Sequence, residues 1–139
     1  MKTFITSGDG ETFALGERLG KALKGRETIA FYGEPGAGKT VMTKGIAKGL
    51  GVSALVTSPT FTILNAYEGR ATLFHYDMYR IADVSELEEV GFFENLGEGV
   101  TVVEWSENVE RALPADAIRI RIDYEGEKRR ITVYEDSLL

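Results

Sequence analysis

The sequence has 139 residues, of which 43% are hydrophobic, and this size and composition predict one domain, residues 1–139, with a sizeable core. Its 22 acidic and 16 basic side chains leave a net charge of -6, which disfavours binding of nucleic acid by phosphate neutralisation alone. The absence of cysteine and the single histidine exclude a disulfide framework and a thiolate or multi-histidine metal centre. Because no segment has the apolar length of a signal sequence or a membrane span, we expect a cytoplasmic protein with no membrane partner.

The first half of the chain predicts a helix, a strand and a second helix. Apolar residues recur at helical spacing over residues 10–24, and Gly25 follows where a helix end is expected. The β-prone run 28–32 predicts a buried parallel strand that leads into a glycine-rich segment, residues 33–40. A second helix follows at once and ends near Gly51.

The second half predicts mainly strands. In chain order we expect a hairpin of residues 61–67 and 71–76 that turns at Gly69 and Arg70, an acidic helix over 83–90, a buried strand over 100–103, and a final hairpin of 117–123 and 129–135. Helices combined with parallel and antiparallel strands predict an α/β fold. We expect a three-layer arrangement like that of P-loop NTPases, with a mainly parallel central sheet, antiparallel edge strands and a C-terminal hairpin.

Residues 33–40 match G-x-x-x-x-G-K-T, the Walker A pattern, between a predicted strand and a predicted helix. In such a loop the glycines let backbone N–H groups surround a phosphate, and the helix N-terminus favours the negative charge. Lys39 would neutralise phosphate oxygens, and the Thr40 hydroxyl would bind Mg²⁺. The predicted nucleotide-binding residues of the loop are Gly33, Glu34, Pro35, Gly36, Ala37, Gly38, Lys39, Thr40 and Val41. An ordinary glycine turn before a helix is the alternative.

Two carboxylates end predicted strands. Glu104 follows the apolar run 100–103, as the acidic residue of a Walker B strand does, and we predict that it is a magnesium ligand. Asp77 ends a second apolar strand and would orient the attacking water or hold a magnesium-bound water. The alternative for Glu104 is a surface glutamate at a strand end, and the alternatives for Asp77 are a capped turn and an ion pair with Arg80.

Three further features leave alternatives open. The Ser-Pro-Thr segment 58–60 is a loop that reaches the γ-phosphate or a plain proline turn. His75 packs in the core or supports a residue that contacts the ligand. Strand alternation turns Trp105 away from Glu104 into the core, and a contact near the nucleotide is its alternative. Because the sequence has no N-K-x-D tetrapeptide for guanine, we predict ATP as the nucleotide.

Four blocks in this order resemble the bacterial TsaE (YjeE) family over nearly the whole chain. They are the Walker A segment 33–40, the S-P-T-F-T segment 58–62, the H-x-D-x-Y-R segment 75–80 and the V-E-W segment 103–105. The resemblance implies an ATPase that is required for threonylcarbamoyladenosine modification of tRNA. It also implies that the protein acts on a complex of TsaB and TsaD homologues and meets tRNA only indirectly, through these partners.

The same resemblance implies roles for individual residues. Thr40 and Glu104 would bind magnesium, Lys39 would bind phosphate, and Asp77 would be needed for hydrolysis. Thr12 in the first helix and Arg130 in the last strand would lie on the base or ribose side of the nucleotide. The alternative for these last two is an ordinary surface helix and an ordinary edge strand.

Two other functions are compatible with a P-loop. One is transfer of a phosphoryl group to a small molecule, but only about 35 residues follow Val103, which leaves little room for a lid and an arginine-rich acceptor site. The other is nucleotide binding without turnover. Because no arginine occupies an evident finger loop, we expect a Mg²⁺-dependent ATPase that is slow alone and is stimulated by its partners.

Overall fold

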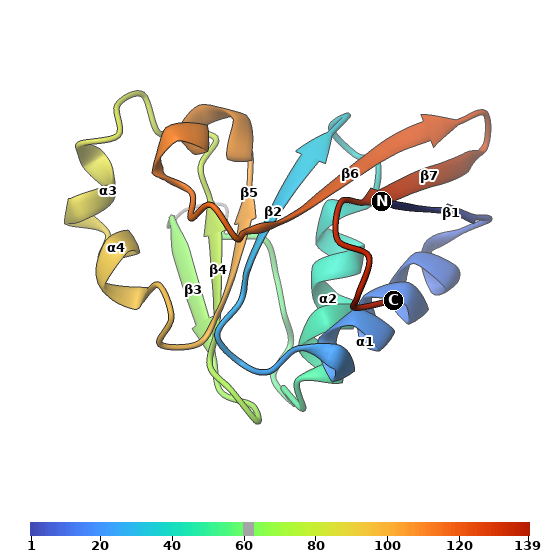
Figure 1. The fold of residues 1–139 in the computed structure, drawn as a ribbon, viewed down its shortest axis with the longest axis horizontal. Helices are drawn as coiled ribbons and strands as arrows, with labels where there is room; N and C mark the ends of the chain where they lie inside the picture. The colour runs from blue at the N-terminus through green and yellow to red at the C-terminus, as the bar shows by residue number, and fades with distance from the viewer. Residues whose placement is uncertain (60–62) are drawn as a thin grey trace.

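The computed structural model describes residues 1–59 and 63–139 and contains one mixed sheet with helices on both faces (Figure 1). The strands are β1 (Lys2–Thr6), β2 (Thr28–Gly33), β3 (Leu64–Tyr67), β4 (Leu73–Asp77), β5 (Val100–Glu104), β6 (Ile118–Glu125) and β7 (Lys128–Val133). The helices are α1 (Asp9–Ala22), α2 (Lys39–Gly49), α3 (Glu86–Glu89), α4 (Phe92–Asn95) and the 3₁₀ helix η1 (Ser106–Ala112).

The seven strands lie in the order β1-β7-β6-β2-β5-β4-β3. The centre of the sheet is parallel, because β2 pairs in parallel with both β6 and β5, and β4 pairs in parallel with β5. The edges are antiparallel, since β3 pairs with β4 on one side and β7 pairs with both β6 and β1 on the other. The predicted α/β fold with a mainly parallel centre, antiparallel edges and a C-terminal hairpin is therefore confirmed.

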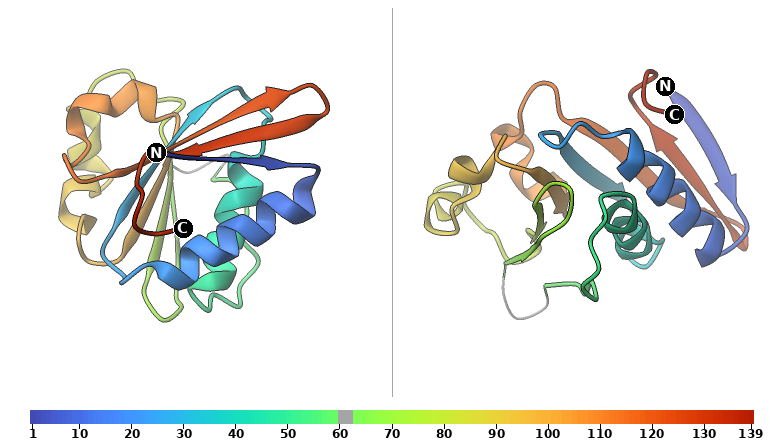
Figure 2. Two further views of the ribbon diagram at one scale, coloured as in Figure 1. Left: turned by 45° about the vertical axis from the view of Figure 1, so that its right-hand side comes forward. Right: turned by 90° about the horizontal axis from the view of Figure 1, so that it is seen from below.

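Two apolar clusters separate the sheet from the helices on its two faces. Leu73, Val100 and Val102 belong to the larger cluster, which they share with α1 and α2. The neighbouring residues Tyr76 and Val103 belong to the smaller cluster, which they share with α3, α4 and η1. Alternate residues of β4 and β5 thus enter opposite cores, as a strand that is buried on both faces requires. Figure 2 shows α1 and α2 side by side on one face of the sheet.

Helices α1 and α2 approach each other through glycines. A Cβ on Gly16 of α1 would lie 2.4 Å from the Met42 carbonyl oxygen, and a Cβ on Gly45 of α2 would lie 2.1 Å from the Phe13 carbonyl oxygen. Any side chain at these positions would force the helices apart. The close crossing fixes α2 against α1, and the first residue of α2, Lys39, is the lysine of the Walker A segment.

Several predicted elements differ in their bounds. Strand β1 was not predicted, because its exposed and partly polar segment gains order only by pairing with β7. The turn expected at Gly69 and Arg70 is longer than two residues: the paired residues Tyr67 and Leu73 enclose a five-residue loop, residues 68–72. The Arg70 N–H donates to the Leu50 carbonyl at 2.7 Å, so this loop is held by the end of α2.

The acidic helix is also shorter than predicted. Only residues 86–89 of the segment 83–90 form α3, and a second short helix, α4, follows after Gly91, which takes a positive φ of 71°. The first two residues of the predicted strand 61–67 lie outside the described residues. Within the described ranges 1–59 and 63–139, none of the helices has the length and apolar character needed to cross a bilayer.

Candidate nucleotide-binding site

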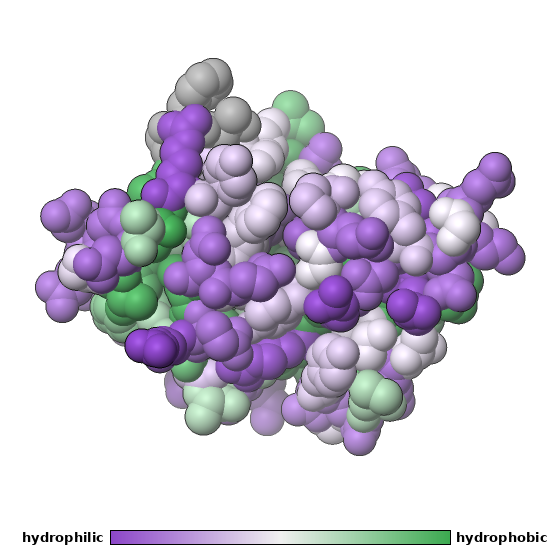
Figure 3. Space-filling model, turned by 90° about the horizontal axis from the view of Figure 1, so that it is seen from above, coloured by the Kyte–Doolittle hydropathy of each residue, from purple (hydrophilic) through white to green (hydrophobic). Residues whose placement is uncertain are grey.

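The Walker A segment lies at the carboxyl end of β2, directly before α2. Gly33 ends β2 with φ +114°, and a Cβ there would lie 2.0 Å from the Ile122 carbonyl oxygen on β6. Gly38 precedes α2 with φ +119°. Both positions therefore require glycine, because a side chain would be strained at this φ and at Gly33 would also meet the neighbouring strand. Figure 3 views the molecule from this end of the sheet, where the surface is predominantly hydrophilic.

A cavity of about 250 Å³ opens beside the segment. Its lining residues are Pro35, Gly36, Gly38, Lys39, Thr40, Val41, Glu104 and Trp105. Six of these eight belong to the predicted nucleotide-binding loop 33–41, and the other two are the last residue of β5 and the residue after it, so the cavity joins the two motifs found in the sequence. The exposed backbone of a glycine-rich turn and the N-terminus of an eleven-residue helix meet in it, an arrangement that binds phosphate groups in other proteins.

Lys39 is almost buried, with 6% of its surface exposed, and its ammonium group stays beside the loop. Its Nζ donates to the Gly33 carbonyl at 2.9 Å and lies 5.3 Å from the centre of the Trp105 ring. The positive charge is therefore held at the cavity by a backbone acceptor and an aromatic face.

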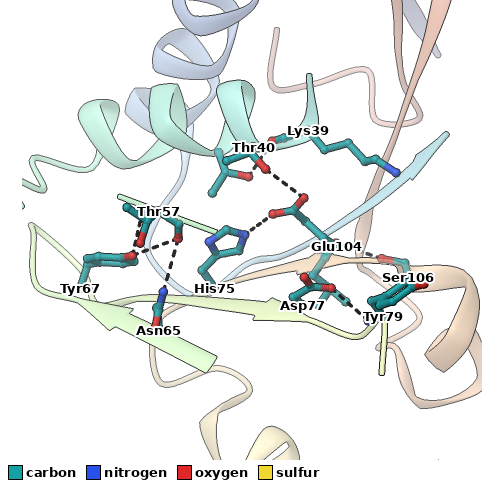
Figure 4. Close-up of polar contacts among 12 residues, drawn as sticks. Lys39, Thr40, Thr57, Asn65, Tyr67, His75, Asp77, Tyr79, Glu104 and Ser106 are labelled. Atoms are coloured by element: carbon teal, nitrogen blue, oxygen red, sulfur yellow. Dashed lines mark hydrogen bonds and ion pairs between the residues drawn. The ribbon is translucent and has the colours of Figure 1, made fainter. Parts of the chain in front are cut away.

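Glu104 lies between two polar side chains (Figure 4). The Thr40 hydroxyl donates to Glu104 Oε1 at 3.3 Å, and His75 Nε2 is hydrogen-bonded to Glu104 Oε2. Both His75 and Glu104 are buried, at 0% and 7% exposure. His75 is thus a core residue that also contacts Glu104, a residue the sequence alone did not identify as its partner, and a supporting role in ligand binding stays a prediction.

Asp77 ends β4 directly beside Glu104, its register partner at the end of β5. The half-buried Asp77 carboxylate accepts a hydrogen bond from the Tyr79 N–H at 3.0 Å. Within the described residues, no ion pair joins Asp77 to Arg80. The two carboxylates predicted from strand ends therefore lie side by side at the carboxyl ends of neighbouring strands, and Glu104 lines the cavity.

Trp105 lies between the smaller apolar cluster and the cavity. Strand β5 ends at Glu104, and Trp105 takes φ +60° and ψ +43° before η1 begins. The indole packs against the smaller apolar cluster, and it also lines the cavity together with Glu104 and faces Lys39. Strand alternation, which predicts that Trp105 faces away from Glu104, is wrong here because the strand has already ended, and a contact of Trp105 with the nucleotide stays a prediction.

The two residues expected near the base or ribose lie in different surroundings. Thr12 is buried beneath Gly38, and its hydroxyl is 2.8 Å from the Thr6 hydroxyl. Arg130 is exposed on β7 and donates to Glu125 at 2.8 Å. Their contact with a nucleotide stays a prediction.

Arg129, the neighbour of Arg130, contacts the Walker A segment: its Nε donates to the Ala37 carbonyl at 3.1 Å. Tyr124 also contacts this segment, since its hydroxyl donates to the Pro35 carbonyl at 3.2 Å. Sequence reasoning missed both residues. Side chains alternate between the two faces of a strand, so alternate residues of the hairpin share one face. The sequence does not show which of these two sets faces the Walker A segment.

Of the Ser-Pro-Thr segment, Thr60 lies outside the described residues. Thr57, which directly precedes the segment 58–60, contacts β3. Its N–H donates to the Tyr67 hydroxyl at 3.2 Å, and its carbonyl accepts from the same hydroxyl at 3.3 Å. A role for this segment at the γ-phosphate stays a prediction.

The cavity offers oxygen atoms as possible metal ligands. Thr40 Oγ1 and Glu104 Oε1 face each other at 3.3 Å, and hydroxyl and carboxylate oxygens suit Mg²⁺, which usually keeps several waters and binds substrate phosphates. Within the described ranges, no group of three or more histidine or acidic side chains forms a metal cluster. The donor set of one hydroxyl and one carboxylate fits a cation whose remaining ligands come from water and a bound nucleotide.

Comparisons of the sequence with known proteins all match the same family. The family model described as "Threonylcarbamoyl adenosine biosynthesis protein TsaE" matches residues 6–132. The tRNA threonylcarbamoyladenosine biosynthesis protein TsaE of Treponema pallidum is 40% identical over 126 residues, which are 88% of this chain and 93% of that protein. The TsaE protein of Bacillus subtilis is 40% identical over 122 residues, 86% of this chain and 76% of that protein.

A solved structure shares the fold. The crystal structure of Bacillus subtilis YdiB superposes with a TM-score of 0.76 at 33% sequence identity, and the match covers 95% of this chain and 83% of that chain. The similarity therefore extends across the sheet and the flanking helices and is not confined to the Walker A segment.

Proposed function

The chain belongs to the TsaE family of tRNA threonylcarbamoyladenosine biosynthesis, and from that premise we propose that it binds ATP with Mg²⁺ and hydrolyses it in support of this modification. The observation that carries the proposal is the cavity at the Walker A segment, where Lys39, Thr40 and Glu104 line one space. A triphosphate is the ligand that a glycine-rich turn, a lysine and two hard oxygen atoms favour together.

In the proposed mechanism the backbone N–H groups of the loop and the Lys39 ammonium bind the β- and γ-phosphates. Thr40 and Glu104 would hold Mg²⁺, and the bound ion would supply positive charge to neutralise the charge that develops on the phosphoryl oxygens. Asp77, beside Glu104 at the strand ends, orients the attacking water or accepts its proton.

The proposed partners are TsaB and TsaD homologues, in the cytoplasm, and tRNA contacts these partners and not this chain. The net charge of -6 supports the proposal that tRNA does not contact this chain, because direct binding to tRNA relies on neutralising phosphates with basic side chains. The partners also explain how hydrolysis becomes faster, because a cation that a partner places at the γ-phosphate accelerates phosphoryl transfer by roughly 10³ to 10⁵.

The test is the fate of γ-labelled ATP incubated with the protein alone, with purified TsaB and TsaD homologues, and with the Lys39→Ala variant. We expect label in inorganic phosphate, slowly for the protein alone and faster with the partners, and almost none with Lys39→Ala. Label in a small acceptor would establish a phosphotransferase instead. Label that stays in ATP even with the partners would leave nucleotide binding without turnover, and unchanged hydrolysis by a folded Lys39→Ala protein would refute the P-loop assignment.

A further inference from the structure

The C-terminal hairpin holds the outer side of the Walker A segment. The Tyr124 hydroxyl donates to the Pro35 carbonyl at 3.2 Å, and Arg129 Nε donates to the Ala37 carbonyl at 3.1 Å. The Tyr124 N–H also donates to Glu34 Oε2 at 2.9 Å. Three contacts thus connect two residues of the hairpin with three residues of the loop, and none of the three is needed to describe the binding of ATP.

Tyr124 and Arg129, here called the hairpin clamp, also hold each other. The Arg129 guanidinium carbon lies 4.4 Å from the centre of the Tyr124 ring. Arg129 Nη1 donates to the carbonyls of Glu127 and Lys128 at 3.2 and 3.1 Å. The arginine is therefore fixed by its own hairpin and by an aromatic face, and it meets the loop from a defined position.

The loop carbonyls that accept hydrogen bonds from the clamp belong to peptides of the predicted phosphate-binding turn. When successive backbone N–H groups converge on an anion, the carbonyl groups of the same peptides turn away from it. The clamp bonds the carbonyls of Pro35 and Ala37, which share their peptide planes with the N–H groups of Gly36 and Gly38, and these two glycines line the cavity. The loop is further pinned by the Glu34 N–H, which donates to the Ile122 carbonyl at 3.2 Å.

We propose that Tyr124 and Arg129 are positioning residues that hold the Walker A segment in its phosphate-binding conformation before any nucleotide arrives. A loop that is already ordered loses less conformational freedom on binding, and its affinity for phosphates rises accordingly. The inference deepens the proposed function and rests on it only for the identity of the ligand. Direct contact of the clamp with the base or ribose is the competing explanation.

Pyrophosphate distinguishes the two explanations, because it occupies the phosphate positions but has neither base nor ribose. Tyr124→Phe removes only the hydroxyl, and Arg129→Met removes the guanidinium while keeping most of the aliphatic chain. Tyr134→Phe and Arg121→Met are matched controls: Tyr134 is 52% exposed just beyond β7, and Arg121 is paired with Asp123 on β6 of the same hairpin. Arg121→Met also accounts for the loss of one positive charge.

The measurements are calorimetric titrations with ADP and with pyrophosphate, and ¹⁵N relaxation of the ligand-free protein. For either clamp variant we expect both dissociation constants to rise by the same factor, roughly 3- to 10-fold, as expected for one lost hydrogen bond. We also expect the order parameters of the Gly36, Ala37 and Gly38 amides to fall from about 0.85 towards the flexible range below about 0.6. The two controls should change neither quantity.

Weaker binding of ADP with unchanged pyrophosphate affinity would overturn the inference in favour of base or ribose contact. Unchanged order parameters in both clamp variants would overturn it as well. Failure of the wild-type protein to bind either ligand would refute the proposed function, and the relaxation of the ligand-free loop would still decide whether the clamp orders it.

Discussion

The His75 imidazole and the Glu104 carboxylate are hydrogen-bonded across the adjacent parallel strands β4 and β5. The other carboxylate oxygen of Glu104 accepts from Thr40 at 3.3 Å, so one acidic side chain links β4, β5 and the first turn of α2. With both oxygens engaged and 7% of the residue exposed, Glu104 has one defined orientation at the cavity. A carboxylate that is fixed in this way is suited to accept a metal ion without reorganisation.

The first prediction concerns this hydrogen bond. We expect His75→Leu to lower the free energy of unfolding by about 1–3 kcal/mol, because the nearly buried carboxylate would lose one of its two partners. His75→Gln, which keeps an N–H donor, should recover part of this loss. Urea denaturation followed by circular dichroism measures both changes, and equal stability of His75→Leu and the wild-type protein would show that the bond contributes nothing.

The second prediction compares two glycines of α1. Gly16→Ala should destabilise the protein by about 1–3 kcal/mol, because its Cβ would lie 2.4 Å from the Met42 carbonyl oxygen on α2. Gly10→Ala is the matched control: no atom lies within 4 Å of its Cβ position, and alanine favours a helix by up to about 1 kcal/mol. Thermal unfolding of the two variants should therefore shift in opposite directions or leave Gly10→Ala unchanged, and a stable Gly16→Ala protein would contradict the close helix crossing.

The third prediction concerns pH and Glu27, in the loop between α1 and β2. Burial alone would raise the pKa of this carboxyl, but hydrogen bonds from neighbouring backbone N–H groups outweigh it and leave the pKa below its usual value of 4.5. The donors include the N–H groups of Lys24, Gly25 and Arg26, at 2.8, 2.9 and 3.0 Å. Because the folded-state pKa is lowered, this stabilisation is present above the usual value and disappears as the pH falls through the folded-state pKa.

Glu27→Gln tests this linkage. At pH 7 the wild-type protein should be more stable than Glu27→Gln, and the difference should shrink as the pH is lowered below about 4.5. Urea denaturation of both proteins across the acidic range measures the difference. A constant difference at every pH would show that the charge of Glu27 does not contribute.

The fold could be predicted wherever the local pattern and the tertiary environment agree. The apolar runs that became β2 and β5 are buried on both faces, so their composition alone marks them. Strand β1 could not be predicted, because its register with β7 joins residues near opposite ends of the chain and its own side chains are mostly exposed. The length of the loop before β4 depends on a contact with α2 that no local pattern reveals.

The site could be predicted as far as its motifs extend. The Walker A spacing and the strand-end acids identified Lys39, Thr40 and Glu104, and the structure brings these three together around one cavity. The contacts of Arg129 and Tyr124 with the loop could not be predicted, because they depend on which face of the hairpin meets the Walker A segment. That face is set by the pairing of β6 with β2, which the sequence does not encode locally.

The last prediction separates the two strand-end carboxylates. Glu104 bonds the Thr40 hydroxyl and lines the cavity, whereas Asp77 bonds the Tyr79 N–H one strand further from α2. A group that binds Mg²⁺ affects metal-dependent binding, and a group that orients water affects mainly the chemical step. We therefore expect Glu104→Ala to lose the Mg²⁺ dependence of nucleotide affinity. Asp77→Ala should bind MgATP normally and hydrolyse it roughly 10²- to 10⁴-fold more slowly.

Titration with a fluorescent ATP analogue, with and without Mg²⁺, measures the first effect, and hydrolysis in the presence of TsaB and TsaD homologues measures the second. Glu107→Ala removes an exposed carboxylate three residues beyond Glu104 and should change neither quantity, which controls for a general loss of negative charge. Normal hydrolysis by Asp77→Ala would assign Asp77 to the turn that it forms with Tyr79. Retained Mg²⁺ dependence in Glu104→Ala would show that Thr40 and the phosphates hold the cation without this carboxylate, and the bond between His75 and Glu104 would then serve only the folded state.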